Sequence, residues 1–231
     1  MATSVALILV CSVFILLIHR GKYSPSLAPT QRRGREYLEV GILVVCLLIV
    51  PFIKFNLLWF SGWLGAYLVF LLLAPLVMEV IVRRRSLSAI GFRMPTNKRA
   101  LMLVAVILGI YLVARLGWPL AQGRAYHFDL RGFISNSILF AFLEEAMFRG
   151  AIQTRLESAL GAVRSWVLSG LFFGFYHYWA NYLVPGKAVA AADVLALASL
   201  AVLGMLLGVV FAKTRSLLPS LLIHALHNFS P

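Results

Sequence analysis

Long, mostly apolar runs alternate along the chain with short links that hold most of its charged residues. Such runs predict transmembrane helices, because about 20 apolar residues in a helix cross the ~30 Å core of a bilayer. A semi-polar piece at 87–93, ended by Gly91, predicts a short interfacial helix. The chain is expected to fold as an all-α, polytopic transmembrane helical bundle of about eight helices, at 4–18, 38–53, 57–82, 101–120, 133–153, 165–183, 194–212 and 217–229.

Composition supports a membrane protein. Hydrophobic residues make up 61% of the 231 residues, and the mean hydropathy of +0.91 is too high for one soluble core. The last predicted helix is too short to cross the bilayer, so we expect it to end midway or to be surrounded by its neighbours. No repeat, low-complexity tract or linker divides the chain. We therefore expect residues 1–231 to form a single, integral, multi-pass membrane domain, in the plasma membrane if the source is bacterial.

The charge is strongly basic, with 21 Lys and Arg against 8 Asp and Glu, a net charge of +13. The basic residues lie in the links between apolar runs, which indicates topology signals and contacts with lipid phosphates and gives no indication of nucleic acid. If alternate links are cytoplasmic, 15 basic residues lie on that side and 4 on the other. This asymmetry predicts that both termini lie outside.

The sequence Leu-Glu-Glu-Ala-Met-Phe-Arg-Gly at 143–150 places charges inside the fifth apolar run. Each charge at such a depth costs roughly 2.5 to 3.5 kcal/mol on insertion, so it indicates a functional site. On a helix, Glu145 and Arg149 share one face and can neutralise each other. Glu144 is rotated by about 100° and has no partner within the motif, which makes it the carboxylate available for chemistry.

Three further polar residues fall at a matching depth in later helices. Counting 1.5 Å per residue places Glu144, His177, His224 and Asn228 at roughly 12 to 18 Å from the cytoplasmic side. A carboxylate, two imidazoles and an amide are what hydrolysis by water needs: a base, donors for the oxyanion and an acid for the leaving amine. Any one of them alone is more simply explained by packing, and the Glu145–Arg149 pair by a structural clamp.

The motifs Glu144-Glu145-x-x-x-Arg149, Phe173-x-x-x-His177 and His224-x-x-x-Asn228 occur in that order on separate apolar helices. This arrangement resembles the CAAX prenyl protease and bacteriocin-processing (CPBP, abortive-infection-like) family of intramembrane endopeptidases, which is related to the type II CAAX prenyl endopeptidase. The resemblance covers residues 133–231, the expected catalytic core.

The resemblance implies a membrane bundle with a water-filled cavity. Glu144 and His177 would activate water, His224 and Asn228 would stabilise the oxyanion, and Arg149 would orient Glu144 and Glu145. A Zn²⁺ ion held by Glu144, His177 and His224 is the alternative, because three protein ligands and an open position suit catalytic zinc. The chain has no HExxH motif, and we favour the metal-free form. His227 departs from the pattern and, if it faced the cavity, would compete with His224 for its role.

The expected substrate is a membrane-anchored or lipid-modified protein or peptide that arrives laterally or from the cytoplasm. Two other classes of function stay open on the sequence alone. A non-enzymatic immunity or assembly partner would use the polar cluster for binding, and would tolerate Glu144→Gln. A proton-coupled transporter would use Glu144 and the histidines as a relay, but the first half of the chain has no polar counterpart to the second, as inverted repeats would require.

Overall fold

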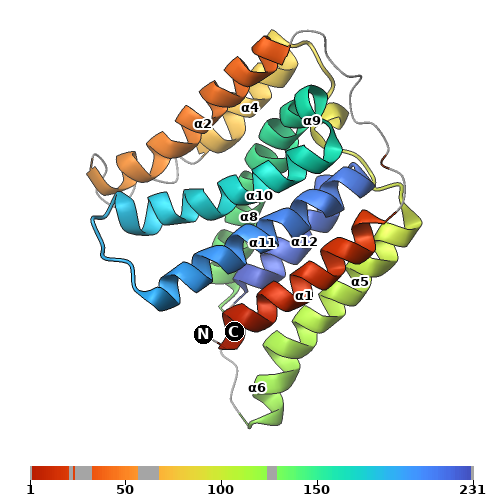
Figure 1. Cartoon of the computed structure of the whole chain (residues 1–231), viewed down its shortest axis with the longest axis vertical. Helices are drawn as coiled ribbons and strands as arrows, with labels where there is room; N and C mark the ends of the chain where they lie inside the picture. Colours follow the sequence, from red (N-terminus) through yellow and green to blue (C-terminus); the bar gives the residue numbers. More distant parts are fainter. Residues whose placement is uncertain (1, 21–22, 24–32, 57–67, 124–128, 230–231) are drawn as a thin grey trace.

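The computed structural model describes residues 2–20, 23, 33–56, 68–123 and 129–229 (Figure 1). These residues form helices and contain no strand, so the all-α fold class is confirmed. In the labels below, η marks a 3-10 or π helix. The elements are α1 (Ala2–His19), α2 (Arg33–Asn56), η1 (Leu68–Leu73), α4 (Ala74–Leu76), η2 (Val77–Val82), η3 (Leu87–Ile90), α5 (Lys98–Leu112), η4 (Val113–Gly117), α6 (Trp118–Ala121), α7 (Leu130–Gly132), η5 (Phe133–Leu139), α8 (Phe140–Glu145), η6 (Ala146–Gln153), α9 (Thr154–Leu160), α10 (Ala162–Tyr178), η7 (Trp179–Leu183), α11 (Ala191–Thr214) and α12 (Leu217–Asn228).

Each predicted apolar run is helical where the structure describes it. The first part of the third run, residues 57–67, lies outside the described residues, and its remainder forms the consecutive elements η1, α4 and η2. Within the described part of the chain, the helices Arg33–Lys54, Lys98–Gly117 and Ala191–Thr214 are long and apolar enough to cross a membrane. Thr3–His19 and Leu68–Val82 are shorter apolar helices. The number of crossings and their orientation stay a prediction.

Helices α10 and α11 lie against each other along their length at the centre of the bundle (Figure 1). Glycines permit this approach. A Cβ added at Gly170 would lie 2.5 Å from the backbone nitrogen of Met205, and one added at Gly204 would lie 3.0 Å from the Cα of Gly170. Gly204 and Gly208 are small residues four apart on one face of α11, and both lie in this tight helix contact.

Two apolar clusters fill the bundle. One joins α1, α5, α10, α11 and α12, and the other joins α2, η1, α10 and the helix that carries the Glu-Glu motif. The outer faces of the peripheral helices also expose large apolar side chains, among them Leu9, Leu16, Val45, Ile81 and Val113. Apolar side chains that face outward all around a bundle indicate surroundings of lipid.

The predicted interfacial helix at 87–93 is a single 3-10 turn, Leu87–Ile90, and it ends as expected at Gly91, whose φ is 94°. The turn lies against the core: Ile90 is buried, and its carbonyl would lie 2.9 Å from a Cβ added at Gly150. The carbonyl of Gly91 accepts a hydrogen bond from the backbone N–H of Leu217 at 3.0 Å. This turn therefore connects the helix of the Glu-Glu motif with the start of α12.

The fifth helix is longer than the predicted 133–153. Its segments α7, η5, α8, η6 and α9 follow one another without a break from residue 130 to 160. The predicted bounds place Arg155 in the link after this helix, but the structure places it within α9, with its side chain fully buried. Its Nε lies 2.9 Å from Glu39 of α2 and its Nη1 lies 2.6 Å from Glu79 of η2. These carboxylates offset the cost of burying the guanidinium, which a hydropathy pattern does not register.

Candidate functional site

The Glu-Glu motif lies at the junction of α8 and η6, facing α10, α11 and α12. Arg149 Nε is 3.4 Å from Glu145 Oε2, and both side chains are fully buried. Arg149 Nη2 also donates to the carbonyl of Gly204 at 3.0 Å. One turn further on, Gln153 Nε2 donates to the carbonyl of Gly208 at 2.8 Å. Arg149 and Gln153 on one helix thus bind the buried backbone carbonyls of Gly204 and Gly208 on the other.

His224 of α12 lies between the two glutamates. Its Nδ1 is 3.0 Å from Glu145 Oε1, and its Nε2 is 3.6 Å from Glu144 Oε2. The first distance is that of a hydrogen bond, whereas the second is longer than one. Glu145, already paired with Arg149, therefore orients the His224 ring so that Nε2 faces Glu144. The Glu144 side chain keeps 12% of its surface exposed, and that of Glu145 none, so Glu144 is the carboxylate that a small molecule can reach.

The Phe173 ring of α10 lies against His224, His177 and Arg149. Its ring centroid is 5.4 Å from that of His224, 4.5 Å from that of His177 and 4.9 Å from the Cζ atom of Arg149. His177 is half-buried, and its Nδ1 donates to the Phe173 carbonyl at 2.8 Å. Because a carbonyl only accepts, this bond leaves Nε2 as the nitrogen of a neutral ring that can accept a proton.

Two other predicted residues lie at the edge of this group. Asn228 is exposed, and its Nδ2 is 3.5 Å from the carbonyl of Asn136. The His227 ring turns toward α5, where its Nδ1 is 3.3 Å from the hydroxyl of Tyr111. The His227 carbonyl accepts a hydrogen bond from Arg115 Nη2 at 2.6 Å. The structure thus places His224, and not His227, against the glutamates.

The predicted alternative of a zinc ion can be compared with these positions. In the part of the chain that the structure describes, no three His, Cys, Asp or Glu side chains form a group arranged to hold a metal ion. Glu144 and His224 approach each other, but His177 does not complete a three-ligand set with them. These side chains as placed do not build a zinc centre, so no step below is derived through a metal. Dependence on zinc stays a prediction.

Sequence reasoning missed how the motifs are joined. Arg149 and Gln153 are four residues apart, as are Gly204 and Gly208, and this matched spacing is the signal that could have paired the two helices. The contact of His224 with Glu145 had no such signal, because 79 residues separate the two side chains.

The carboxylates and histidines of this site lie within a bundle of apolar helices, an arrangement typical of a helical membrane protein. Residues 126–230 match the family model described as Type II CAAX prenyl endopeptidase Rce1-like. This region of the chain is therefore an Rce1-like domain, which confirms the resemblance to the CAAX protease family and indicates a membrane endopeptidase. No curated protein matches the chain, and no solved structure does.

Proposed function

We propose that this protein is an intramembrane endopeptidase that hydrolyses a peptide bond of a membrane-anchored or lipid-modified protein or peptide. The observation that carries the proposal is the position of His224 between Glu144 and Glu145, at 3.6 and 3.0 Å. The match to the Rce1-like family supports the same reaction class.

Glu144 and His177 are proposed to activate the attacking water. Glu144 is the more accessible of the two glutamates, and His177 presents Nε2 as an acceptor once its Nδ1 is bound to the Phe173 carbonyl. A general base must reach the proton that it removes, either directly or through one water. Glu144 lies 3.6 Å from His224, and the rings of His224 and His177 both pack against Phe173.

His224 and Asn228 are proposed to stabilise the oxyanion that forms on the scissile carbonyl. Donors aimed at such an oxygen are worth several kcal/mol where water is excluded. In this role His224 acts in its doubly protonated form, because Nδ1–H donates to Glu145 and Nε2–H is needed to donate to the oxyanion. Arg149 holds Glu145 in turn, so the pair acts by fixing the ring. Asn228 lies one helical turn beyond His224 and completes the donor pair when it turns from the Asn136 carbonyl to the substrate.

The substrate class follows from the surroundings of the site. Apolar side chains face outward on the peripheral helices, so a substrate that is itself anchored in lipid can reach the helices laterally. We propose a membrane-anchored or lipid-modified protein for this reason. Equal cleavage of a soluble, unanchored peptide by the purified enzyme would contradict this part of the proposal.

The experiment compares protein termini in membranes of cells that express the wild-type chain, Glu144→Gln or Asp129→Asn at matched levels. Gln keeps the shape of Glu144 and removes the base. Asp129→Asn makes the same chemical change at an exposed residue whose side chain makes no capping bond. We expect specific termini to appear with the wild type and with Asp129→Asn, and to vanish with Glu144→Gln.

Those termini would also identify the substrate. If all three membranes give the same profile while the phenotype of the wild-type chain persists, the endopeptidase proposal fails. The polar cluster would then be better explained by binding to another membrane protein.

A further inference from the structure

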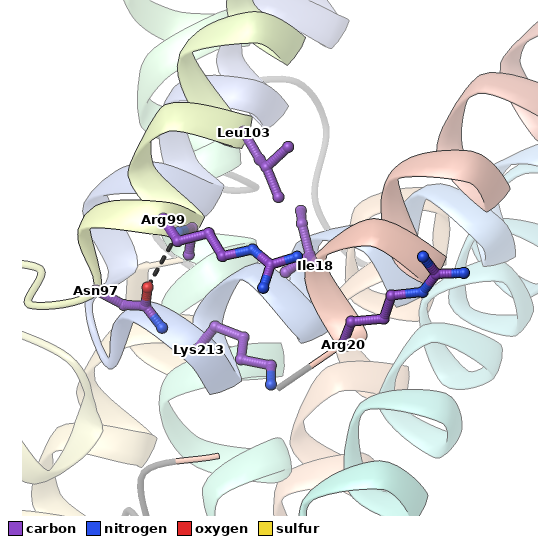
Figure 2. A pocket seen from close by; sticks show the side chains of 7 residues that line it. Ile18, Arg20, Asn97, Arg99, Leu103 and Lys213 are labelled. Carbon is purple, nitrogen blue, oxygen red and sulfur yellow. Dashed lines mark hydrogen bonds between the residues drawn. The ribbon is translucent and has the colours of Figure 1, made fainter. Parts of the chain in front are cut away.

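A second polar site lies where the ends of three helices meet, away from the glutamates. A pocket of about 180 Å³ is lined by residues from α1, α5 and α11 and by their flanking positions (Figure 2). Arg20, Arg99 and Lys213 contribute three positive charges to its wall, and no carboxylate belongs to it. A volume of this size would hold roughly six waters, or one small ionic group.

The positive charges come from different elements and surround one space. Figure 2 shows Arg99 of α5 and Lys213 of α11 extending into it, while Arg20, just after α1, lines its edge with the guanidinium turned away from the other two side chains. Lys213 is buried, and its Nζ lies 3.6 Å from the centre of the Tyr23 ring. Tyr23 is held in turn by Trp166, whose Nε1 donates to the Tyr23 hydroxyl at 3.2 Å. The ammonium group is therefore fixed at the pocket by a cation–π contact.

The start of α5 adds to this positive field. Asn97 caps the helix by accepting a hydrogen bond from the backbone N–H of Ala100 at 3.0 Å, and both residues line the pocket. The first turn of a helix carries a partial positive charge and favours an anion. Three cations held around one cavity repel one another, and an anion within the cavity relieves this repulsion.

The remainder of the wall is apolar, formed by Ile18, Ala100 and Leu103. Ile18 lies close to Arg20 at the end of α1, and Ala100 and Leu103 lie close to Arg99 at the start of α5. The pocket therefore combines a hydrophobic side with a cationic side. An anionic headgroup attached to hydrocarbon chains has the same two parts. Basic pockets between membrane helices bind lipid headgroups in this way.

The pocket is separate from the proposed catalytic group. Lys213 lies nine residues after Gly204 on α11, which is roughly 13 Å along the helix axis. Gly204 is the residue whose carbonyl binds Arg149 of the catalytic group. An occupant of the pocket therefore would not touch Glu144 or His224.

We propose that this pocket binds a phosphate-bearing anion, supplied by the headgroup of an anionic phospholipid. Arg99 donates to the phosphate oxygens, Lys213 supplies a fixed point charge, and Arg20 adds positive charge at the edge of the pocket. The apolar wall accepts the start of the lipid chains. Free inorganic phosphate offers the same charge without the chains, and the experiment separates these two sources.

The test titrates the purified full chain in neutral detergent with phosphatidylglycerol, phosphatidylcholine or inorganic phosphate, and measures bound ligand by native mass spectrometry. The variant Arg20→Gln/Arg99→Gln removes two charges from the pocket at exposed positions. Lys98→Gln/Arg164→Gln is the matched control, because it removes two exposed charges that do not line the pocket.

We expect the wild type and the control to bind phosphatidylglycerol with the same apparent Kd, and the pocket variant to bind roughly 30-fold more weakly. Displacement of the lipid by millimolar inorganic phosphate would identify the phosphate group alone as the ligand. Equal binding by the two variants, or equal binding of phosphatidylcholine by the wild type, would overturn the proposal.

Discussion

The Glu145–Arg149 pair allows a quantitative test of how the site is held together. Both side chains are fully buried, with 3.4 Å between Arg149 Nε and Glu145 Oε2. At an effective dielectric constant of about 20, two unit charges at this distance attract by about 5 kcal/mol. Glu145→Gln keeps an oxygen that accepts from His224 Nδ1 but removes the negative charge. The buried guanidinium of Arg149 is then left without its counter-ion. We expect it to lower the free energy of unfolding by about 3–5 kcal/mol.

The partner substitution Arg149→Met leaves the buried Glu145 carboxylate without its counter-ion and the carbonyl of Gly204 without its hydrogen-bond donor. We expect a loss of about 3–5 kcal/mol here also. The double variant leaves neither of these two charges unpaired. The Gly204 carbonyl, which has lost its donor, then accounts for most of the remaining loss of stability, about 1–3 kcal/mol. The double-mutant cycle should therefore give a coupling energy of about 6 kcal/mol for the central values of these ranges, comparable to the direct attraction of the two charges.

The measurement is reversible unfolding of the purified variants in mixed detergent micelles. Endopeptidase activity is assayed in parallel, because a clamp that fixes His224 should affect activity even in folded protein. If the two single effects add to the double effect within about 0.5 kcal/mol, the two charges do not stabilise each other and the argument is wrong.

Three further predictions concern packing, the buried ion pairs and metal. Gly204→Ala should lower the free energy of unfolding by about 1–3 kcal/mol, because its new Cβ would lie 2.9 Å from the Cβ of Phe173. Gly109→Ala is the control: its Cβ would have nothing within 4 Å, and the change should stabilise the helix by up to about 1 kcal/mol. Thermal unfolding compares the two variants. Arg155→Met should cost about 3–5 kcal/mol, because fully buried Glu79 loses its partner at 2.6 Å and keeps only Arg85 at 3.7 Å, whereas Glu39 retains Arg83 at 2.7 Å. Exposed Arg164→Met should cost less than about 0.5 kcal/mol, and chemical unfolding compares the two. Dialysis against a zinc chelator should leave endopeptidase activity unchanged; loss of activity with recovery on adding Zn²⁺ would establish the metal-dependent alternative.

Much of this protein could be predicted from the sequence. The apolar runs determine helices wherever the structure describes them, because a backbone in lipid must satisfy its own hydrogen bonds. The motif spacing gave the Glu145–Arg149 contact, since residues four apart on a helix are neighbours. The order of the motifs was sufficient to identify the family that residues 126–230 match.

Only the tertiary structure decided how these parts meet. Helix periodicity carries no information on which face of α12 turns toward the glutamates, so the contacts of His224 with Glu144 and Glu145 required the packed bundle. The burial of Arg155 likewise depends on Glu39 and Glu79, which lie far from it in sequence. A charge is read as exposed when its sequence neighbours are polar, but the free energy of burying it depends on the carboxylates that other helices bring within about 3 Å.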